Sequence, residues 1–141
     1  MLVNNYLQVF EIIGLDVGEA RVGVARAHSV AKLPEPIYIA PTNTAVDYIQ
    51  SFVKTNAAHL MVIGIPLQPD GKEGEQAKMV RDFAKQLYTA VPIPQIFIDE
   101  TYTTIEADHY LKVHNPTKAD SNDDIAACII LERYFNGAAH V

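Results

Sequence analysis

The chain has 141 residues, 49% of them hydrophobic, and a formal net charge of −6. This length and composition predict one compact α/β domain spanning residues 1–141, with an adequate core and no second domain. The negative charge argues against a broad basic face that grips nucleic acid, although it does not exclude a nuclease. Short apolar runs and a first ten residues without secretory features predict a cytoplasmic protein, with no membrane partner.

Three short apolar runs open the chain and predict strands over Val9–Asp16, Arg21–Ala27 and Pro36–Ala40. A turn containing Gly18 joins the first two runs, so an antiparallel hairpin or meander is expected. Apolar residues at helical spacing then predict a helix that runs to Ala57, with a capping box at Thr44–Asp47.

An almost wholly apolar segment, His59–Ile65, predicts a strand buried on both faces, which we place at the centre of the sheet. A turn-rich loop over Pro66–Gly74 precedes an amphipathic helix over Ala77–Leu87, and a strand ends at Asp99. This strand–helix–strand unit implies parallel pairing, so both strands should end on the same side. Capping boxes are predicted at Thr103–Glu106 for a short helix and at Ser121–Asp124 for a last helix that runs to Phe135.

Acidic residues stand at three places where a regular element ends or begins. They are Asp16, the pair Asp99 and Glu100, and the pair Asp123 and Asp124. Carboxylates gathered from distant segments can hold a divalent cation, and magnesium prefers oxygen ligands. If the three ends converge, the chain has a metal-dependent active site. Without metal, the mutual repulsion of such carboxylates should leave the site loose or partly protonated.

Other metal and redox sites are not indicated. The five histidines lack zinc-ligand spacing, because His109 and His114 are five residues apart and no cysteine pair accompanies them. The lone Cys128 cannot form a disulfide within the chain and is expected to be a core residue.

Four sequence blocks carry a family resemblance. The first is Gly14–Ala25, with the sequence GLDVGEARVGVA, and the second comprises Gly64–Leu67 and Asp70–Ala77. The third is Asp99–Glu100 followed by Tyr102–Thr104, and the last is Asp123–Ala127 followed by Ile129–Leu131. In this order the blocks resemble those of the YqgF family, the RuvC-related nucleases with a ribonuclease H-like fold.

The resemblance implies a ribonuclease H-like five-stranded mixed sheet, with the first three strands antiparallel and helices flanking it. It also implies that Asp16, Glu100 and Asp123 are the catalytic and metal-binding acids. Asp99 is the close alternative to Glu100, whereas Asp124 is assigned to helix capping. We expect two Mg²⁺ or Mn²⁺ ions, with Asp16 bridging them.

Three further residues are predicted to contact substrate. Arg21 lies close to Asp16 in sequence, although an exposed hairpin residue is an equal alternative, and Thr103 and Thr104 could contact a phosphate or cap a helix. Thr101 stands where the family pattern has an arginine, so a partner for phosphate or carboxylate is missing there.

The activity implied by the resemblance is a metal-dependent endonuclease, with processing of the 5′ end of pre-16S rRNA as the first candidate. Resolution of Holliday junctions is the alternative, and a homodimer or a ribosome-assembly partner is possible. A noncatalytic domain that binds nucleic acid or the ribosome remains a third interpretation. A nucleotide-binding module is a fourth, but the chain has no second glycine-rich phosphate loop.

Overall fold

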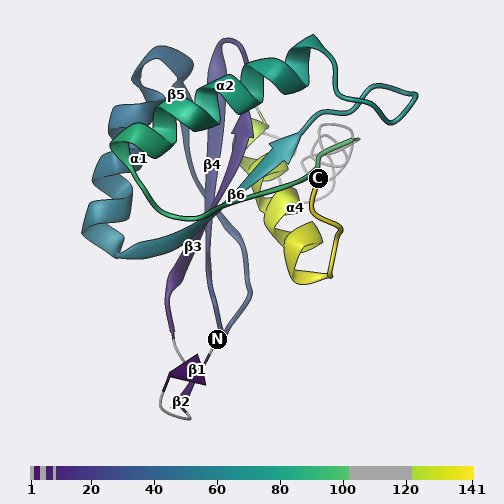
Figure 1. Ribbon diagram of the computed structural model, residues 1–141. Helices are drawn as coiled ribbons and strands as arrows, with labels where there is room; N and C mark the ends of the chain where they lie inside the picture. Colours follow the sequence, from purple (N-terminus) through teal and green to yellow (C-terminus); the bar gives the residue numbers. More distant parts are fainter. Residues whose placement is uncertain (1, 4–5, 8, 102–121) are drawn as a thin grey trace.

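The computed structural model describes residues 2–3, 6–7, 9–101 and 122–141. Its centre is a five-stranded sheet with the strand order β5-β4-β3-β6-β7 (Figure 1). A separate two-stranded hairpin, β1 (Leu2–Val3) with β2 (Tyr6–Leu7), was not predicted from the sequence. No helix in the described part of the chain has the length and apolar character needed to cross a membrane.

The first half of the sheet is the predicted antiparallel meander. Strands β3 (Glu11–Val17), β4 (Arg21–His28) and β5 (Glu35–Pro41) pair in sequence order. The turn between β3 and β4 is closed by the Gly18 amide, which donates to the Arg21 carbonyl at 2.8 Å. The three predicted strands are therefore confirmed, with their bounds shifted by up to two residues.

The second half of the sheet is parallel, as the strand–helix–strand pattern predicted. Strand β6 (Ala58–Ile65) pairs with β3, and β7 (Gln95–Asp99) pairs with β6. The prediction that β6 is the central strand was wrong, because β3 is central and β6 lies between β3 and β7. A strand is buried on both faces wherever it has a neighbour on each side and helices above and below. Burial therefore did not reveal which strand is central.

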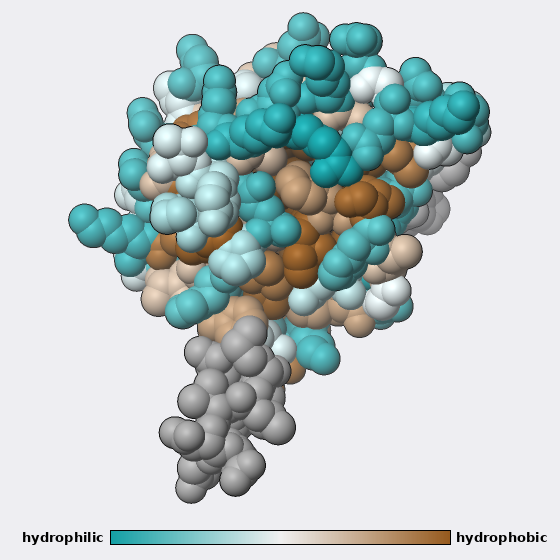
Figure 2. All heavy atoms as spheres, in the orientation of Figure 1, coloured by the Kyte–Doolittle hydropathy of each residue, from teal (hydrophilic) through white to brown (hydrophobic). Residues whose placement is uncertain are grey.

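Helices cover both faces of the sheet. Helices α1 (Thr42–Asn56) and α2 (Glu75–Ala90) lie on one face, and α4 (Asp123–Phe135) lies on the other (Figure 1). The region of the surface over α1 and α2 is mainly hydrophilic in Figure 2. Their buried side chains pack against the sheet, as expected for amphipathic helices.

The predicted helix starts need correction. Helix α1 begins at Thr42 after Pro41, so Thr44 lies inside the first turn, where its hydroxyl donates to the Pro41 carbonyl at 3.2 Å. Asn122, with no side-chain capping bond, occupies the N-cap of α4. The predicted caps at Thr103 and Ser121 lie outside the described residues.

Alternation along the strands separates two cores. On β3, Ile13, Leu15 and Val17 belong to the core under α1 and α2, whereas Ile12 belongs to the core under α4. Because successive side chains point to opposite faces, Asp16 shares the α4 face with Ile12. The same rule applied to β7 places Glu100 on the α4 face, after Ile96 and Ile98.

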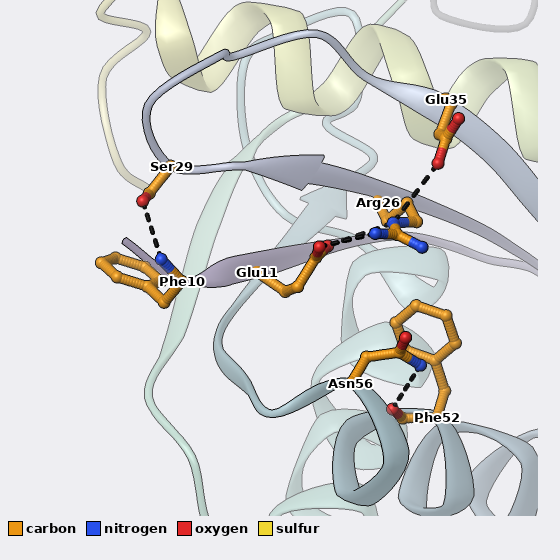
Figure 3. Close-up of polar contacts among 7 residues, drawn as sticks. All are labelled: Phe10, Glu11, Arg26, Ser29, Glu35, Phe52 and Asn56. Atoms are coloured by element: carbon orange, nitrogen blue, oxygen red, sulfur yellow. Dashed lines mark hydrogen bonds and ion pairs between the residues drawn. The ribbon is translucent and has the colours of Figure 1, made fainter. Parts of the chain in front are cut away.

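The end of β3 distant from Asp16 carries a charge network (Figure 3). Arg26 donates to both carboxylate oxygens of Glu11, at 2.6 and 3.1 Å, and also lies 3.3 Å from Glu35. Glu11 is the first residue of β3, and Asp16 is its sixth. Arg26 is therefore engaged in ion pairs at the end of the strand opposite to Asp16.

Candidate active site

A cavity of about 730 Å³ opens at the end of the sheet where β3, β6 and β7 terminate. The turn after β3, the loop after β6 and the first residues of α2 and α4 also contribute to its wall. The cavity is lined by Asp16, Val17, Gly18, Glu19, Pro66, Leu67, Glu75, Gln76, Met79, Glu100, Thr101 and Asp123. Three segments far apart in sequence thus bring Asp16, Glu100 and Asp123 to one place.

The Glu100 backbone is hydrogen-bonded to β6 directly after the end of β7. Its amide donates to the Ile65 carbonyl at 3.0 Å, which continues the parallel pairing one residue beyond the strand. Only 9% of the residue is exposed, and its Oε2 atom has no hydrogen-bond partner among the described residues. A buried carboxylate oxygen without a partner is costly, so this atom is suited to a ligand.

Gly64 makes the space that Glu100 occupies. A Cβ atom at position 64 would lie 2.8 Å from both the Cβ and the Oε2 of Glu100, and 2.5 Å from Ile130. Any larger residue would displace the carboxylate or the helix behind it.

The structure distinguishes Glu100 from its neighbour Asp99. Asp99 Oδ1 accepts hydrogen bonds from the amide and the hydroxyl of Thr101, so this carboxylate serves the local turn. Asp99 is not among the residues that line the cavity. The geometry therefore favours Glu100, although the catalytic role of the three acids stays a prediction.

Close packing of α4 on the sheet positions Asp123. Gly23 on β4 is paired with Asp16 on β3, and a Cβ atom at Gly23 would lie 1.9 Å from the Asp123 carbonyl oxygen. Helix α4 therefore begins directly over the strand next to Asp16. The adjacent Asp124 is buried and accepts a hydrogen bond from the Ile125 amide at 2.9 Å, which supports the start of the helix.

Burial and mutual repulsion dominate the electrostatics of these acids. Burial, followed by the charge of Asp16 and a hydrogen bond with Asp16, raises the pKa of Glu100 to about 9. Burial also raises the pKa of Asp16. A hydrogen bond with Glu100 lowers this pKa, and the charge of Asp123 raises it by a smaller amount. Without a cation, Asp16 and Glu100 together therefore retain a proton at neutral pH, as the sequence analysis expected.

Arg133 is a part of this site that the sequence analysis missed. From the last turn of α4 it donates to the carbonyl oxygens of Asp99 and Thr101, at 3.0 and 2.7 Å, and so holds the backbone on both sides of Glu100. Its charge lowers the pKa of Glu100 against the larger effects that raise it. Arg133 brings a positive charge next to Thr101, the position where the family pattern has arginine. Nothing in the sequence around Arg133 indicated this contact.

Arg21 lies beside the site. Its Nε donates to Asp123 Oδ2 at 2.8 Å, and this contact raises the pKa of Arg21. The side chain is 57% exposed, so Arg21 is both an exposed hairpin residue and a neighbour of the acids. The other two predicted substrate contacts, Thr103 and Thr104, lie outside the described residues.

The acids fit a hard divalent cation by ligand type, although not yet by arrangement. In the described part of the chain, no group of three or more candidate ligands stands close enough to hold a metal ion. Glu100 nevertheless offers a carboxylate oxygen without a described partner next to Asp16, and carboxylate oxygens are the ligands that Mg²⁺ prefers. Cys128 is buried within α4, as expected of a core residue.

The sheet order, with acids near the carboxyl ends of β3 and β7, defines a ribonuclease H-like fold. The structure of T. thermophilus RuvC in complex with Holliday junction substrate superposes with a TM-score of 0.58 and 8% identity, covering 94% of this chain and 99% of that one. A second structure of Thermus thermophilus RuvC matches with a TM-score of 0.57 and 7% identity, covering 94% and 100%. At this identity the similarity shows the fold alone.

Sequence relationships are closer and identify the family. The family model of RuvX, described as Holliday junction resolvase, matches residues 10–137, and the chain belongs to this family. A protein of Roseiflexus sp. (strain RS-1), named "Putative pre-16S rRNA nuclease", is 33% identical over 131 residues, which cover 89% of this chain and 93% of the relative. A protein of the same name from Crocosphaera subtropica is 35% identical over 130 residues, covering 88% and 91%. The resemblance to the YqgF family noted from the sequence is thus confirmed.

Proposed function

We propose that this protein is a divalent-metal-dependent nuclease that hydrolyses phosphodiester bonds in pre-16S rRNA. The observation that carries the proposal is the pair Asp16 and Glu100, held together at the end of the sheet with Glu100 Oε2 buried. Membership of the RuvX family and the relatives named for pre-16S rRNA cleavage indicate the substrate. The proposed compartment is the cytoplasm.

In this proposal Asp16, Glu100 and Asp123 hold two Mg²⁺ or Mn²⁺ ions. Asp16 would be the ligand common to both ions, because Glu100 and Asp123 both affect its pKa. Divalent ions, when bound, stabilise charge on the phosphodiester and favour ionisation of the attacking water. Asp16, Glu100 and Asp123 would supply three negative charges once the proton that Asp16 and Glu100 share has passed to solvent water.

Positioning comes from the surrounding structure. The hydrogen bond from the Glu100 amide to the Ile65 carbonyl, and the two hydrogen bonds from Arg133 to the flanking carbonyl groups, hold the Glu100 backbone in place against repulsion between the acids. Thr103 and Thr104 are retained as proposed phosphate contacts, and Arg21 as a third.

Holliday junction resolution is the second candidate, supported by the description of the matching family model. Two strands of a junction must be cut in a symmetric manner, so this activity favours a homodimer, whereas trimming of RNA needs one site. A ribosome-assembly partner would instead support the RNA activity.

Cleavage assays test these alternatives. Labelled pre-16S rRNA fragments and four-way DNA junctions should be incubated at low salt with Mg²⁺ or Mn²⁺, using wild-type protein, Asp16→Asn and the exposed-surface control Glu132→Gln. We expect RNA cleavage that chelator and Asp16→Asn abolish and that Glu132→Gln preserves. Cleavage of the junction alone would identify a resolvase. Binding without cleavage by folded protein would indicate a noncatalytic domain and refute the proposal.

A further inference from the structure

The ion pair between Arg21 and Asp123 joins the β3–β4 hairpin to the first residue of α4. These residues are 102 positions apart in sequence, and their side chains meet at 2.8 Å between Nε and Oδ2. The Arg21 backbone is fixed, because its carbonyl accepts from Gly18 and the preceding Ala20 carbonyl accepts from Thr42. The side chain beyond this anchored backbone is more than half exposed, so it can change partners without disturbing the fold.

We infer that Arg21 acts as a metal-responsive latch, pairing with Asp123 when no cation is bound and turning to a substrate phosphate when a cation takes Asp123. The inference rests on the proposed function and assigns to Arg21 a positioning role that depends on the state of the site.

Charge favours the exchange of partners. A guanidinium and a divalent cation compete for the same carboxylate, and they repel each other at contact distance. Once separated from Asp123, which lines the cavity, Arg21 presents a planar fork of donors that suits a phosphate group. The latch also explains why the three acids are not arranged around a common metal position, because Asp123 is paired with Arg21.

Metal affinity gives the first test. Mn²⁺ binding should be measured by calorimetry and by the electron paramagnetic resonance of free Mn²⁺, without nucleic acid, for wild type, Arg21→Gln and Arg21→Lys. An exposed ion pair has a modest strength, so Arg21→Gln should bind Mn²⁺ roughly two- to fivefold more tightly. Arg21→Lys, which keeps the charge but loses the Nε contact, should lie between them.

A double-mutant cycle separates the latch from a general effect of charge. In the Asp123→Asn background, Arg21→Gln should leave Mn²⁺ affinity unchanged, because the partner is absent. Equal tightening in both backgrounds, or no tightening in either, would overturn the inference while leaving the proposed function standing. Absence of Mn²⁺ binding in every variant would overturn both.

The second half of the inference concerns RNA. Affinity for a short single-stranded RNA should be measured against KCl concentration, with EDTA or with Ca²⁺, which also takes oxygen ligands. With Ca²⁺, the wild-type slope should exceed that of Arg21→Gln by about 0.7, the value for one phosphate contact to a single strand. With EDTA the two slopes should agree. Equal slopes in both conditions would show that released Arg21 does not reach a phosphate and would overturn this half.

Discussion

Replacing Glu100 with glutamine should make the metal-free protein more stable at neutral and alkaline pH. Glu100 is 9% exposed, and its pKa is raised from 4.5 to about 9, first by burial and then by the charge of Asp16. Glutamine has the shape of the protonated acid and can donate to Asp16 in the same way. The variant therefore keeps the hydrogen bond and removes the titration.

The sign follows from proton binding. Between pH 4.5 and 9 the folded protein retains a proton at Glu100 that the unfolded chain has lost, so the free energy of unfolding falls as pH rises. Each pH unit in this window is worth about 1.36 kcal/mol. From pH 5 to pH 8, wild-type protein should therefore lose up to about 4 kcal/mol relative to Glu100→Gln.

Urea unfolding in EDTA at pH 5, 6, 7 and 8 would measure the difference. The two proteins should be nearly equal at pH 5 and diverge steadily above it. Glu132→Gln, which removes an exposed carboxylate from α4, should run parallel to wild type. Added Mn²⁺ at pH 8 should stabilise wild type more than Glu100→Gln, because the cation binds the ionised acid. Parallel curves for wild type and Glu100→Gln in EDTA would show that Glu100 is ionised in the folded state and would refute the reasoning.

Three further substitutions test how the site is built. Gly23→Ala places a Cβ atom 1.9 Å from the Asp123 carbonyl oxygen, so it should displace α4 and cost at least about 3 kcal/mol of unfolding free energy. Unchanged stability in urea would contradict this packing. Gly64→Ala should cost about 1–3 kcal/mol and, by moving Glu100, weaken Mn²⁺ binding measured by calorimetry; full Mn²⁺ affinity would argue against the role of Gly64. Arg133→Gln removes two hydrogen bonds to carbonyl groups and should cost about 1.5–3 kcal/mol of unfolding free energy. Because Arg133 lowers the pKa of Glu100, this variant should also shift Mn²⁺ binding to higher pH. Arg133→Lys should restore part of the pH profile but not the stability.

Much of the fold and part of the site could be predicted from local sequence patterns. Short apolar runs bounded by turn residues indicated the strands, because a strand that contacts a core on each face is apolar along most of its length. Side chains that alternate along a strand also distinguish Glu100 from Asp99, because Ile96, Ile98 and Glu100 point to the same face and Asp99 points to the other. The prediction left that choice open because it did not apply the alternation beyond the end of the strand.

Helix starts were predicted less well. The patterns at Thr44 and Ser121 fit capping boxes, yet α1 begins two residues before Thr44 and α4 has Asn122 at its N-cap. A capping pattern spans four residues, and the position where a helix starts also depends on the strand that precedes it. Here β5 runs to Pro41, which leaves Thr42 as the first helical residue.

The sequence by itself determined the strand and helix pattern, the three acidic positions and the family. Only the tertiary structure decided that β3 is the central strand, that α4 begins over Gly23, and that Arg21 meets Asp123 while Arg133 supports the backbone around Glu100. The physical reason is the range of each interaction. Periodicity and turn chemistry act over a few residues and are visible in sequence, whereas these contacts join residues 32 to 102 positions apart and depend on how closely a helix packs on the sheet.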